Sequence, residues 1–247
     1  MTALILIAHG SPDPRAAHCT GELAARVQGL WPNGPVVAAF IEHDEPRLDV
    51  AVGRLVDNGE DDIIVVPLLL SRAFHGRVDV PKAVAAVRAS SPAVIRCAEV
   101  IGADESLLPA LERSLPGTAP VVLAVAGTRD AAAQQDLDRL AAAWSRQRGT
   151  AVVVAHASQG APDITTAIAE LEGAQSAQGA QGAQGAQGAQ GAQAAVASFV
   201  LFEGILPDRI RAAAGPRCVT PALFTSPELF DLVIDRAHAA RSSAVSR

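Results

Sequence analysis

The chain has 247 residues, 49% of them hydrophobic, and a formal net charge of −6. This length suits two domains, and the apolar fraction is sufficient for two cores. The negative charge and the scarcity of aromatic residues argue against a nucleic-acid partner, which calls for basic surfaces and base stacking. No segment reaches the roughly 18 consecutive apolar residues of a membrane span, so we expect a cytoplasmic protein with no membrane partner.

The first half of the chain alternates short apolar runs with helical patterns. Continuous apolar runs are typical of strands that are covered on both faces. The alternation predicts an α/β fold with a parallel sheet and right-handed crossovers. The predicted strands are 3–8, 36–41, 63–69 and 94–100, and the predicted helices are about 16–30, 48–57 and 81–88.

The same order of elements restarts at Val121, where residues 121–130 resemble residues 4–13. We therefore predict two similar flavodoxin-like lobes, residues 1–116 and residues 117–247, each a parallel sheet with helices on both faces. In the second lobe the predicted strands are 151–155, 196–202 and 217–223, after the first at 121, and the predicted helices are about 131–146, 163–171 and 227–240.

The second copy contains a low-complexity tract of Gly-Ala-Gln triplets at about residues 173–194. Glycine at every third position costs a helix about 1 kcal/mol each relative to alanine. The tract has no apolar face to bury and no proline for a collagen-like chain. We expect a mobile surface insertion that lengthens a connection which is short in the first copy.

Three candidate metal ligands follow three different predicted strands of the first copy. His9 comes directly after the first strand, Glu42 after the second, and His75 a few residues after the third. In open α/β sheets ligands bind at the carboxyl ends of the strands, so these side chains should meet. Imidazole and carboxylate together suit Co, Fe, Ni or Zn, and three protein ligands leave positions open for exchange.

The second copy lacks all three candidates, with Ala126, Ser158 and Leu206 at the matching positions. His156 stands opposite Phe40 and is expected to be structural. His43 and Asp44 follow Glu42 and are weaker candidates for the mouth of the site. The backbone N–H groups at Gly10 and Ser11 are candidates for binding an anion, since a helix begins there. No nucleotide-binding glycine motif is present, which argues against the use of ATP.

Three segments of the first copy resemble the sirohydrochlorin chelatases, the small cobaltochelatase and ferrochelatase family. Residues 8–16, AHGSPDPRA, are similar to the family's HGSRDPRA opening, and residues 39–46, AFIEHDEP, to its AFLE…P segment. Residues 65–70, VVPLLL, with Phe74-His75 and then VDVP at 78–81, resemble its VVPLFL…GxH…DIP signature. The resemblance covers residues 3–115 and continues faintly through a degenerate second copy, as in two-lobed members.

The resemblance implies a lyase of siroheme or cobalamin biosynthesis that inserts a divalent metal into a tetrapyrrole without ATP. It implies that His9, Glu42 and His75 bind the metal and that His9 and His75 are catalytic. The partners would be the tetrapyrrole and Co²⁺, Fe²⁺ or Ni²⁺, with no cofactor beyond this metal substrate. Pro12, Ala73 and Gly76 depart from the family pattern and bear on loop shape more than on the ligands.

Several arginines are candidates for the acidic side arms of a tetrapyrrole, because guanidinium groups pair well with carboxylates. These are Arg15, Arg47, Arg72, Arg77 and Arg129. Two alternatives to a chelatase stay open, namely a metal or tetrapyrrole carrier without turnover and a non-haem iron enzyme. The sequence leaves open which metal and which tetrapyrrole are used, as well as the oligomeric state.

Overall fold

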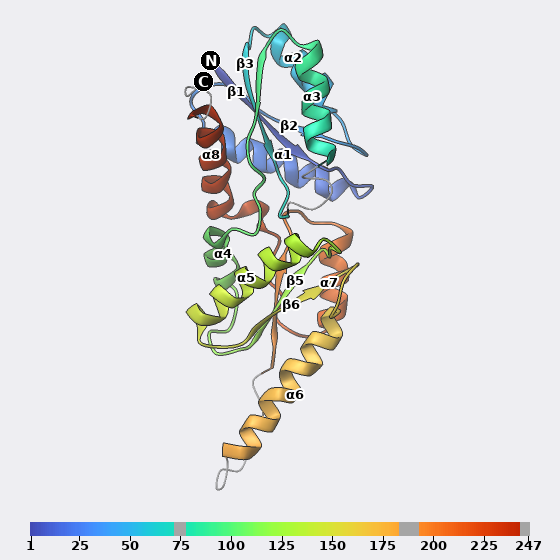
Figure 1. Ribbon diagram of the computed structural model, residues 1–247, viewed down its shortest axis with the longest axis vertical. Coiled ribbons are helices and arrows are strands. Elements are labelled where there is room, and N and C mark those ends of the chain that lie inside the picture. Colours follow the sequence, from blue (N-terminus) through green and yellow to red (C-terminus); the bar gives the residue numbers. More distant parts are fainter. Residues whose placement is uncertain (72–77, 183–192, 243–247) are drawn as a thin grey trace. The chain divides into compact units, whose positions relative to one another are not determined.

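A computed structural model of the chain describes residues 1–71, 78–182 and 193–242 (Figure 1). Its contacts divide the chain into two compact units, neither of which is continuous in sequence. The first unit is Met1–Ser106, Leu201–Gly204 and Leu223–Arg247, and the second unit is Leu107–Val200 and Ile205–Ala222. The boundary that we expected between residues 116 and 117 separates the two copies of the sequence repeat, whereas the two units are defined by contacts. It therefore stays a prediction.

The first unit is built on a four-stranded parallel sheet with the order β2-β1-β3-β4. The first strand is central because it pairs with both β2 and β3. All seven of its residues are buried, as expected for a strand covered on both faces. The strands are β1 (Thr2–Ala8), β2 (Val36–Phe40), β3 (Asp62–Pro67) and β4 (Val94–Cys97).

Helices cover both faces of this sheet (Figure 1). On one face α2 and α3 pack together over a core that includes Ile5 and Ile7 of β1. On the other face α1 and α8 pack together and contact the strands. The two-residue repeat of a strand explains how β1 serves both layers. The helices are α1 (Pro14–Gln28), α2 (Leu48–Asp57), α3 (Val80–Ser90) and α8 (Pro227–Ser242), with short 3₁₀ turns at Glu105–Leu107 and Leu223–Thr225.

The last helix, α8, is fastened to the first unit by Arg236. Its guanidinium donates hydrogen bonds to the carbonyl oxygens of Val100 and Ile101, both at 3.1 Å, and to Asp104 Oδ2 at 2.8 Å. Burial alone would raise the pKa of Asp104, but hydrogen bonds from Ser106 and the Arg236 guanidinium outweigh it and lower that pKa. The C-terminal helix therefore belongs to the fold of the N-terminal unit.

The second unit repeats the central part of the first, with a three-stranded parallel sheet in the order β6-β5-β7. Helix α5 packs on β6, while α6 and α7 contact each other and the strands. The side chain of Arg148 ties α5 to Glu112 and to Pro116 O. Its elements are α4 (Leu108–Glu112), β5 (Val121–Val125), α5 (Ala131–Arg148), β6 (Val152–His156), α6 (Ile164–Gly182), β7 (Ala195–Phe199) and α7 (Ile205–Ala214).

For the second unit one predicted strand is wrong and one helix was missed. The strand predicted at 217–223 is reduced to an isolated bridge between Val196 and Val219. Pro216 and Pro221 flank this bridge, and proline has no N–H to donate to a ladder. Helix α7, which lies where α3 lies in the first copy, was not predicted.

The Gly-Ala-Gln tract begins within a helix, because α6 continues to Gly182 rather than ending near Leu171. Residues 183–192 lie outside the described residues. The two sides of the tract meet at Glu172, whose Oε1 accepts hydrogen bonds from the N–H of Ala194 at 3.1 Å and from Arg217 Nε at 3.0 Å. The hydrogen bond from Arg217 lowers the pKa of Glu172. Among the described helices, none combines the length and the apolarity that crossing a membrane requires.

We predict that Arg236→Met lowers the free energy of unfolding by about 1.5–3 kcal/mol at pH 7, since it removes hydrogen bonds from a charged donor. Because the pKa of Asp104 is lowered in the folded state, its contribution is complete above the pKa of the unfolded chain, about 3.9. It is lost as the pH falls through the lower folded-state pKa, so the difference between wild type and variant should shrink there.

Urea unfolding at a series of pH values measures this difference. Arg211→Met is the matched control, because Arg211 forms an exposed pair with Asp208 three residues away on α7. Such pairs contribute less than about 1 kcal/mol. Equal stability of Arg236→Met and wild type at pH 7 would contradict the proposed role of Arg236.

Candidate metal site at the strand ends of the first unit

The pairing of β1 with β2 continues past the ends of both strands. The N–H of Ile41 donates to the carbonyl oxygen of Ala8 at 3.0 Å, and the N–H of Glu42 donates to that of His9 at 2.9 Å. On the other side of β1, the N–H of Leu68 donates to Ile7 O at 2.8 Å. The chain segments that leave β1, β2 and β3 therefore start side by side, as expected from the sequence.

The close approach of these two segments requires glycine at position 10. Gly10 has a φ of 93°, and a Cβ placed there would lie 1.7 Å from the carbonyl oxygen of Glu42. No side chain fits in that space. The absence of a side chain at Gly10 thus allows His9 and Glu42 to come together.

His9 and Glu42 are in direct contact, with His9 Nε2 3.2 Å from Glu42 Oε1. The other ring nitrogen, Nδ1, lies 3.2 Å from the carbonyl oxygen of Gly10. Both nitrogens of His9 thus face an oxygen acceptor, but a neutral imidazole carries one N–H. With the proton on Nδ1, the lone pairs of Nε2 and Oε1 face each other, and either a further proton or a metal ion between them removes this repulsion. Metal-binding histidines commonly donate their other N–H to a backbone carbonyl in this way.

The spacing of this pair also fits two ligands of one metal ion. Metal–nitrogen and metal–oxygen bonds of about 2.0–2.2 Å place neighbouring ligand atoms roughly 3.0 Å apart at a right angle and roughly 3.4 Å apart in a tetrahedron. The observed 3.2 Å lies between these values. His9 and Glu42 are partly exposed, with 28% and 47% of their side chains accessible, so that an ion can reach them.

A second imidazole lies on the same carboxylate oxygen. His43 Nε2 is 3.1 Å from Glu42 Oε1, and the rings of His9 and His43 are 6.2 Å apart between centroids. The sequence indicated His43 only as a weak candidate for the mouth of the site, because contact between neighbours in a loop cannot be read from spacing. The two imidazoles form two pairs that share one oxygen.

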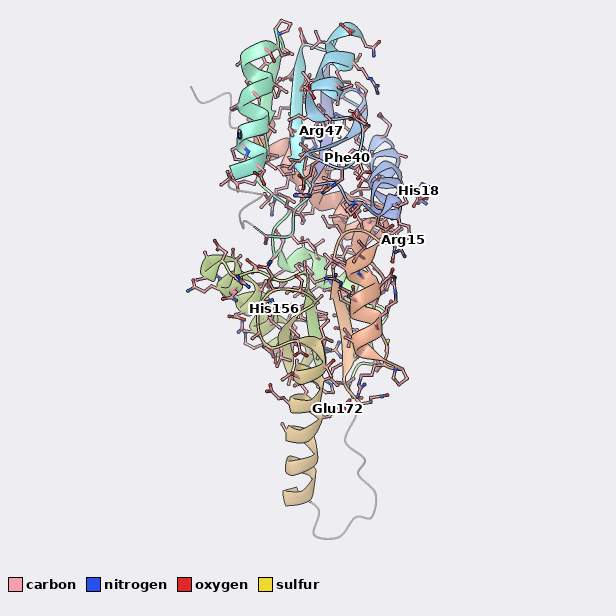
Figure 2. All side chains as sticks on the ribbon, turned by 90° about the vertical axis from the view of Figure 1, so that its right-hand side faces the viewer. Arg15, His18, Phe40, Arg47, His156 and Glu172 are labelled. Atoms are coloured by element: carbon pink, nitrogen blue, oxygen red, sulfur yellow. The ribbon has the colours of Figure 1, made fainter. Side chains whose placement is uncertain are left out.

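The anion expected at the start of the first helix is part of the chain itself. The N–H of Ser11 donates to Asp44 Oδ2 at 2.9 Å. Asp13 is the N-cap of α1, and its carboxylate accepts hydrogen bonds from Arg15 N and from the Arg15 guanidinium. The first contact holds the two loops against each other, and the second engages Arg15, which is labelled in Figure 2, with Asp13. Arg47 and Arg129 are exposed.

The remaining candidates, His75, Arg72 and Arg77, lie outside the described residues. Within the described ranges 1–71, 78–182 and 193–242, no three His, Cys, Asp or Glu side chains are grouped so that they could hold a metal ion. The structure therefore brings together two of the three predicted ligands, and the place of His75 in the site stays a prediction.

Residues 3–117 match the CbiX family model. The sirohydrochlorin cobaltochelatase of Sulfolobus acidocaldarius is 34% identical over 128 residues, which are 52% of this chain and 98% of that protein. The chain belongs to the sirohydrochlorin chelatase family. The sirohydrochlorin ferrochelatase of Bacillus subtilis is 30% identical over 149 residues, which are 56% of each chain.

The fold of both units is similar to that of solved structures. The structure named SirB from Bacillus subtilis with Fe³⁺ matches with a TM-score of 0.80 over 99% of this chain and 98% of that one, at 22% identity. A cobalt complex of the sirohydrochlorin chelatase SirB from Bacillus subtilis subspecies spizizenii matches with a TM-score of 0.78 at 21% identity. At these identities the matches establish the two-sheet chelatase fold.

The second unit keeps the backbone of this site without its ligands. Gly127 has a φ of 117°, and a Cβ there would lie 2.4 Å from Gln159 O, so the two loops also approach closely here, but at the residue after Ser158. At the position of Glu42 stands Ser158, which donates to the carbonyl oxygen of Ala126 at 2.6 Å. A hydrogen bond between side chain and backbone thus replaces the contact between His9 and Glu42.

His156 is buried at the end of β6, with 5% of the residue exposed, and its structural role stays a prediction (Figure 2). Burial lowers the pKa of its imidazole, while the charge of Asp138 opposes this effect. A Cβ added at Gly160 would lie 2.6 Å from the ring, so the following turn packs closely on it.

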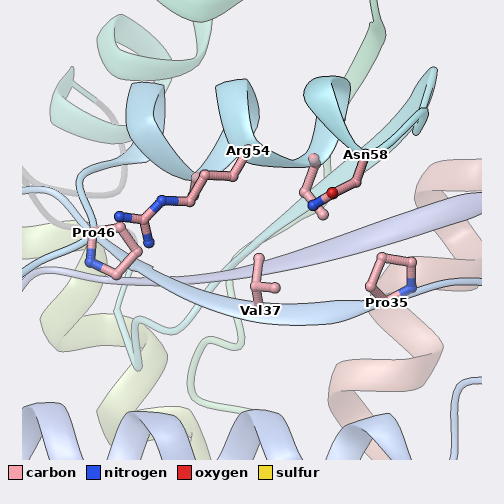
Figure 3. A pocket seen from close by; sticks show the side chains of 7 residues that line it. Pro35, Val37, Pro46, Arg54 and Asn58 are labelled. Atoms are coloured by element: carbon pink, nitrogen blue, oxygen red, sulfur yellow. The ribbon is translucent and has the colours of Figure 1, made fainter.

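The first unit also has a cavity of about 350 Å³ between β2 and α2 (Figure 3). Its wall is mostly apolar, with the guanidinium of Arg54 and the amide of Asn58 as polar groups. One amide beside a positively charged guanidinium does not provide the set of ligands that a divalent cation needs. The cavity is therefore not a metal site, and its lining is Pro35, Val37, Pro46, Ala51, Arg54, Leu55 and Asn58.

We predict that Gly10→Ala destabilises the protein by more than about 2 kcal/mol and weakens metal binding, because the new methyl group must push the carbonyl of Glu42 away. Gly21→Ala is the matched control. Gly21 lies within α1 with no atom within 4 Å of an added Cβ, so alanine there should stabilise the helix by about 0.5–1 kcal/mol. Thermal and urea unfolding of the two variants measure these changes. Gly10→Ala as stable as wild type would disprove the constraint.

We predict that His156 makes the chain less stable in mild acid. Because its pKa is lowered in the folded state, the unfolded chain binds a proton first as the pH falls below about 6.5. Stability should decrease from there by up to about 1.4 kcal/mol per pH unit until the folded state also takes the proton.

His156→Phe tests this effect, since Phe40 fills the corresponding position of the first unit. The variant should show a flatter dependence of unfolding free energy on pH between 7 and 5, whereas His18→Ala, an exposed histidine on α1, should follow wild type. A wild-type slope retained in His156→Phe would assign the acid sensitivity to another group.

Proposed function

We propose that this protein is a sirohydrochlorin chelatase that inserts Co²⁺ or Fe²⁺ into sirohydrochlorin without ATP. The observation that carries the proposal is the pair of His9 Nε2 and Glu42 Oε1, which lie 3.2 Å apart at adjacent strand ends. Curated relatives bear the names sirohydrochlorin cobaltochelatase and sirohydrochlorin ferrochelatase. The metal ion is a substrate, and the proposal includes no further cofactor.

In this proposal His9, Glu42 and His75 bind the metal substrate. Two imidazoles and a carboxylate leave open positions, which a metal needs if it is to be passed to the four nitrogens of a macrocycle. The carbonyl of Gly10 keeps the proton of His9 on Nδ1, so that Nε2 presents its lone pair to the ion.

Metal insertion releases two protons, because the divalent ion replaces the two N–H hydrogens of the macrocycle. When the ion leaves Nε2 of His9 for a macrocycle nitrogen, that lone pair becomes available for one of the protons. Imidazole is the side chain that most often serves as an acid or base in catalysis. His9 therefore acts first as a ligand and then as a base, and the proposal gives His75 the second catalytic position.

A metal-insertion assay with purified protein, sirohydrochlorin and Co²⁺, without ATP, tests the proposal through the visible spectrum of the macrocycle. We predict that His9→Ala and His75→Ala each lower turnover by at least about 100-fold, because each loses a ligand and a proton acceptor. His18→Ala is the matched control, since this histidine is exposed and 3.9 Å from Glu22 on the same unit.

The assay also separates a chelatase from a carrier. A spectral change on binding of the tetrapyrrole, with no metal uptake by the macrocycle, would replace the proposed activity with a carrier role. Unchanged turnover in both His9→Ala and His75→Ala, with the fold retained by circular dichroism, would refute the assigned residues.

A further inference from the structure

Glu42 contacts two imidazoles, those of His9 and His43. The family motifs include His9 but not His43. Its Nε2 is 3.1 Å from the same Oε1 that His9 Nε2 approaches at 3.2 Å. Both distances fit neighbouring ligands of one ion, by the spacing of about 3.0–3.4 Å derived above. The carboxylate can therefore share a cation with either imidazole.

The backbone at His43 is held in a conformation that aims the ring back at Glu42. His43 has a φ of 66°, and within the described parts of the chain it is the one non-glycine residue with positive φ. The N–H of Asp44 donates to the carbonyl oxygen of Glu42 at 2.8 Å, which closes a γ-turn around His43. Such strained backbone is concentrated at functional sites. The corresponding residue of the second copy, Gln159, does not have it.

The other carboxylates of this loop accept hydrogen bonds from backbone N–H groups. Asp44 accepts from Ser11 N at 2.9 Å, and Glu45 accepts from Arg47 N at 3.0 Å. Glu42 is the acidic side chain of this loop that contacts the imidazoles. The loop thus presents a carboxylate with an imidazole on either side and further negative charge close by, which attracts a cation.

The three side chains differ in their exposure to solvent. His43 is 45% exposed, Glu42 is 47% exposed, and His9 is 28% exposed. His43 and Glu42 are therefore more accessible than His9 to an ion that arrives from solvent. Glu42 can keep hold of the ion while the imidazole partner changes, so that no step leaves the cation without a protein ligand.

We propose that His43 and Glu42 form a capture site for the divalent metal substrate, from which the ion passes to Glu42 and His9. The inference rests on the proposed chelatase function and adds a residue to it. His43 contacts the metal during loading, and the insertion step itself takes place at His9.

Steady-state kinetics with Co²⁺ as the varied substrate test this role. We predict that His43→Ala raises the KM for Co²⁺ about 10-fold, a change typical for loss of a group that supports a metal ligand, while kcat stays within about twofold. His43→Asn separates the ring from the turn, because asparagine tolerates a positive φ and lacks the imidazole. It should show the same increase in KM as His43→Ala, and His18→Ala should match wild type.

A binding experiment tests the same contact without turnover. Co²⁺ below one equivalent should broaden the imidazole NMR signals of His43 in the wild type and in His9→Ala, but not in Glu42→Ala. If the wild type showed no metal insertion but Co²⁺ still broadened its His43 signals, the chelatase function would be rejected and the capture site retained. Unchanged KM in His43→Ala, a wild-type KM in His43→Asn, or His43 signals that Co²⁺ leaves sharp would each overturn the inference.

Discussion

The candidate site depends on the contact between the backbone at Gly10 and the carbonyl of Glu42. Parallel pairing places the ends of β1 and β2 side by side, but it does not bring the following loops within van der Waals distance. Glycine does this, because a Cβ would overlap the carbonyl oxygen at 1.7 Å. With the loops in contact, His9 from one loop and Glu42 from the other lie at a distance from each other that suits two ligands of one cation.

The same scaffold occurs twice, with different chemistry on it. In both units a glycine with positive φ follows the first strand, and an aspartate then caps the next helix, Asp13 on α1 and Asp130 on α5. The first unit places His9 and Glu42 on this frame, while the second places Ala126 and Ser158 there. The fold therefore supplies the positions, and the residues at those positions decide whether a metal ion can be bound.

Much of the fold and part of the site could be predicted from the sequence. Apolar runs located the seven strands of the described residues within a few positions, and the convergence of His9 and Glu42 was predictable because ligands bind at the carboxyl ends of parallel strands. The pattern failed at residues 217–223, where Pro216 precedes the segment and Pro221 interrupts it. It also gave no sign that α8 packs on the first unit, because tertiary contacts such as those of Arg236 join residues more than 130 positions apart. The role of His43 depends on a single turn, and residue spacing does not encode that geometry.

The contacts of Glu172 have a consequence for how this gene can vary. One carboxylate fastens the residue before the Gly-Ala-Gln repeats to Ala194 after them and to Arg217, so the excursion starts and finishes at one pinned point of the second unit. The closure entropy of such an excursion rises only with the logarithm of its length. A gain or loss of triplets between Glu172 and Ala194 therefore leaves the anchoring contacts, and the sheet beside them, in place.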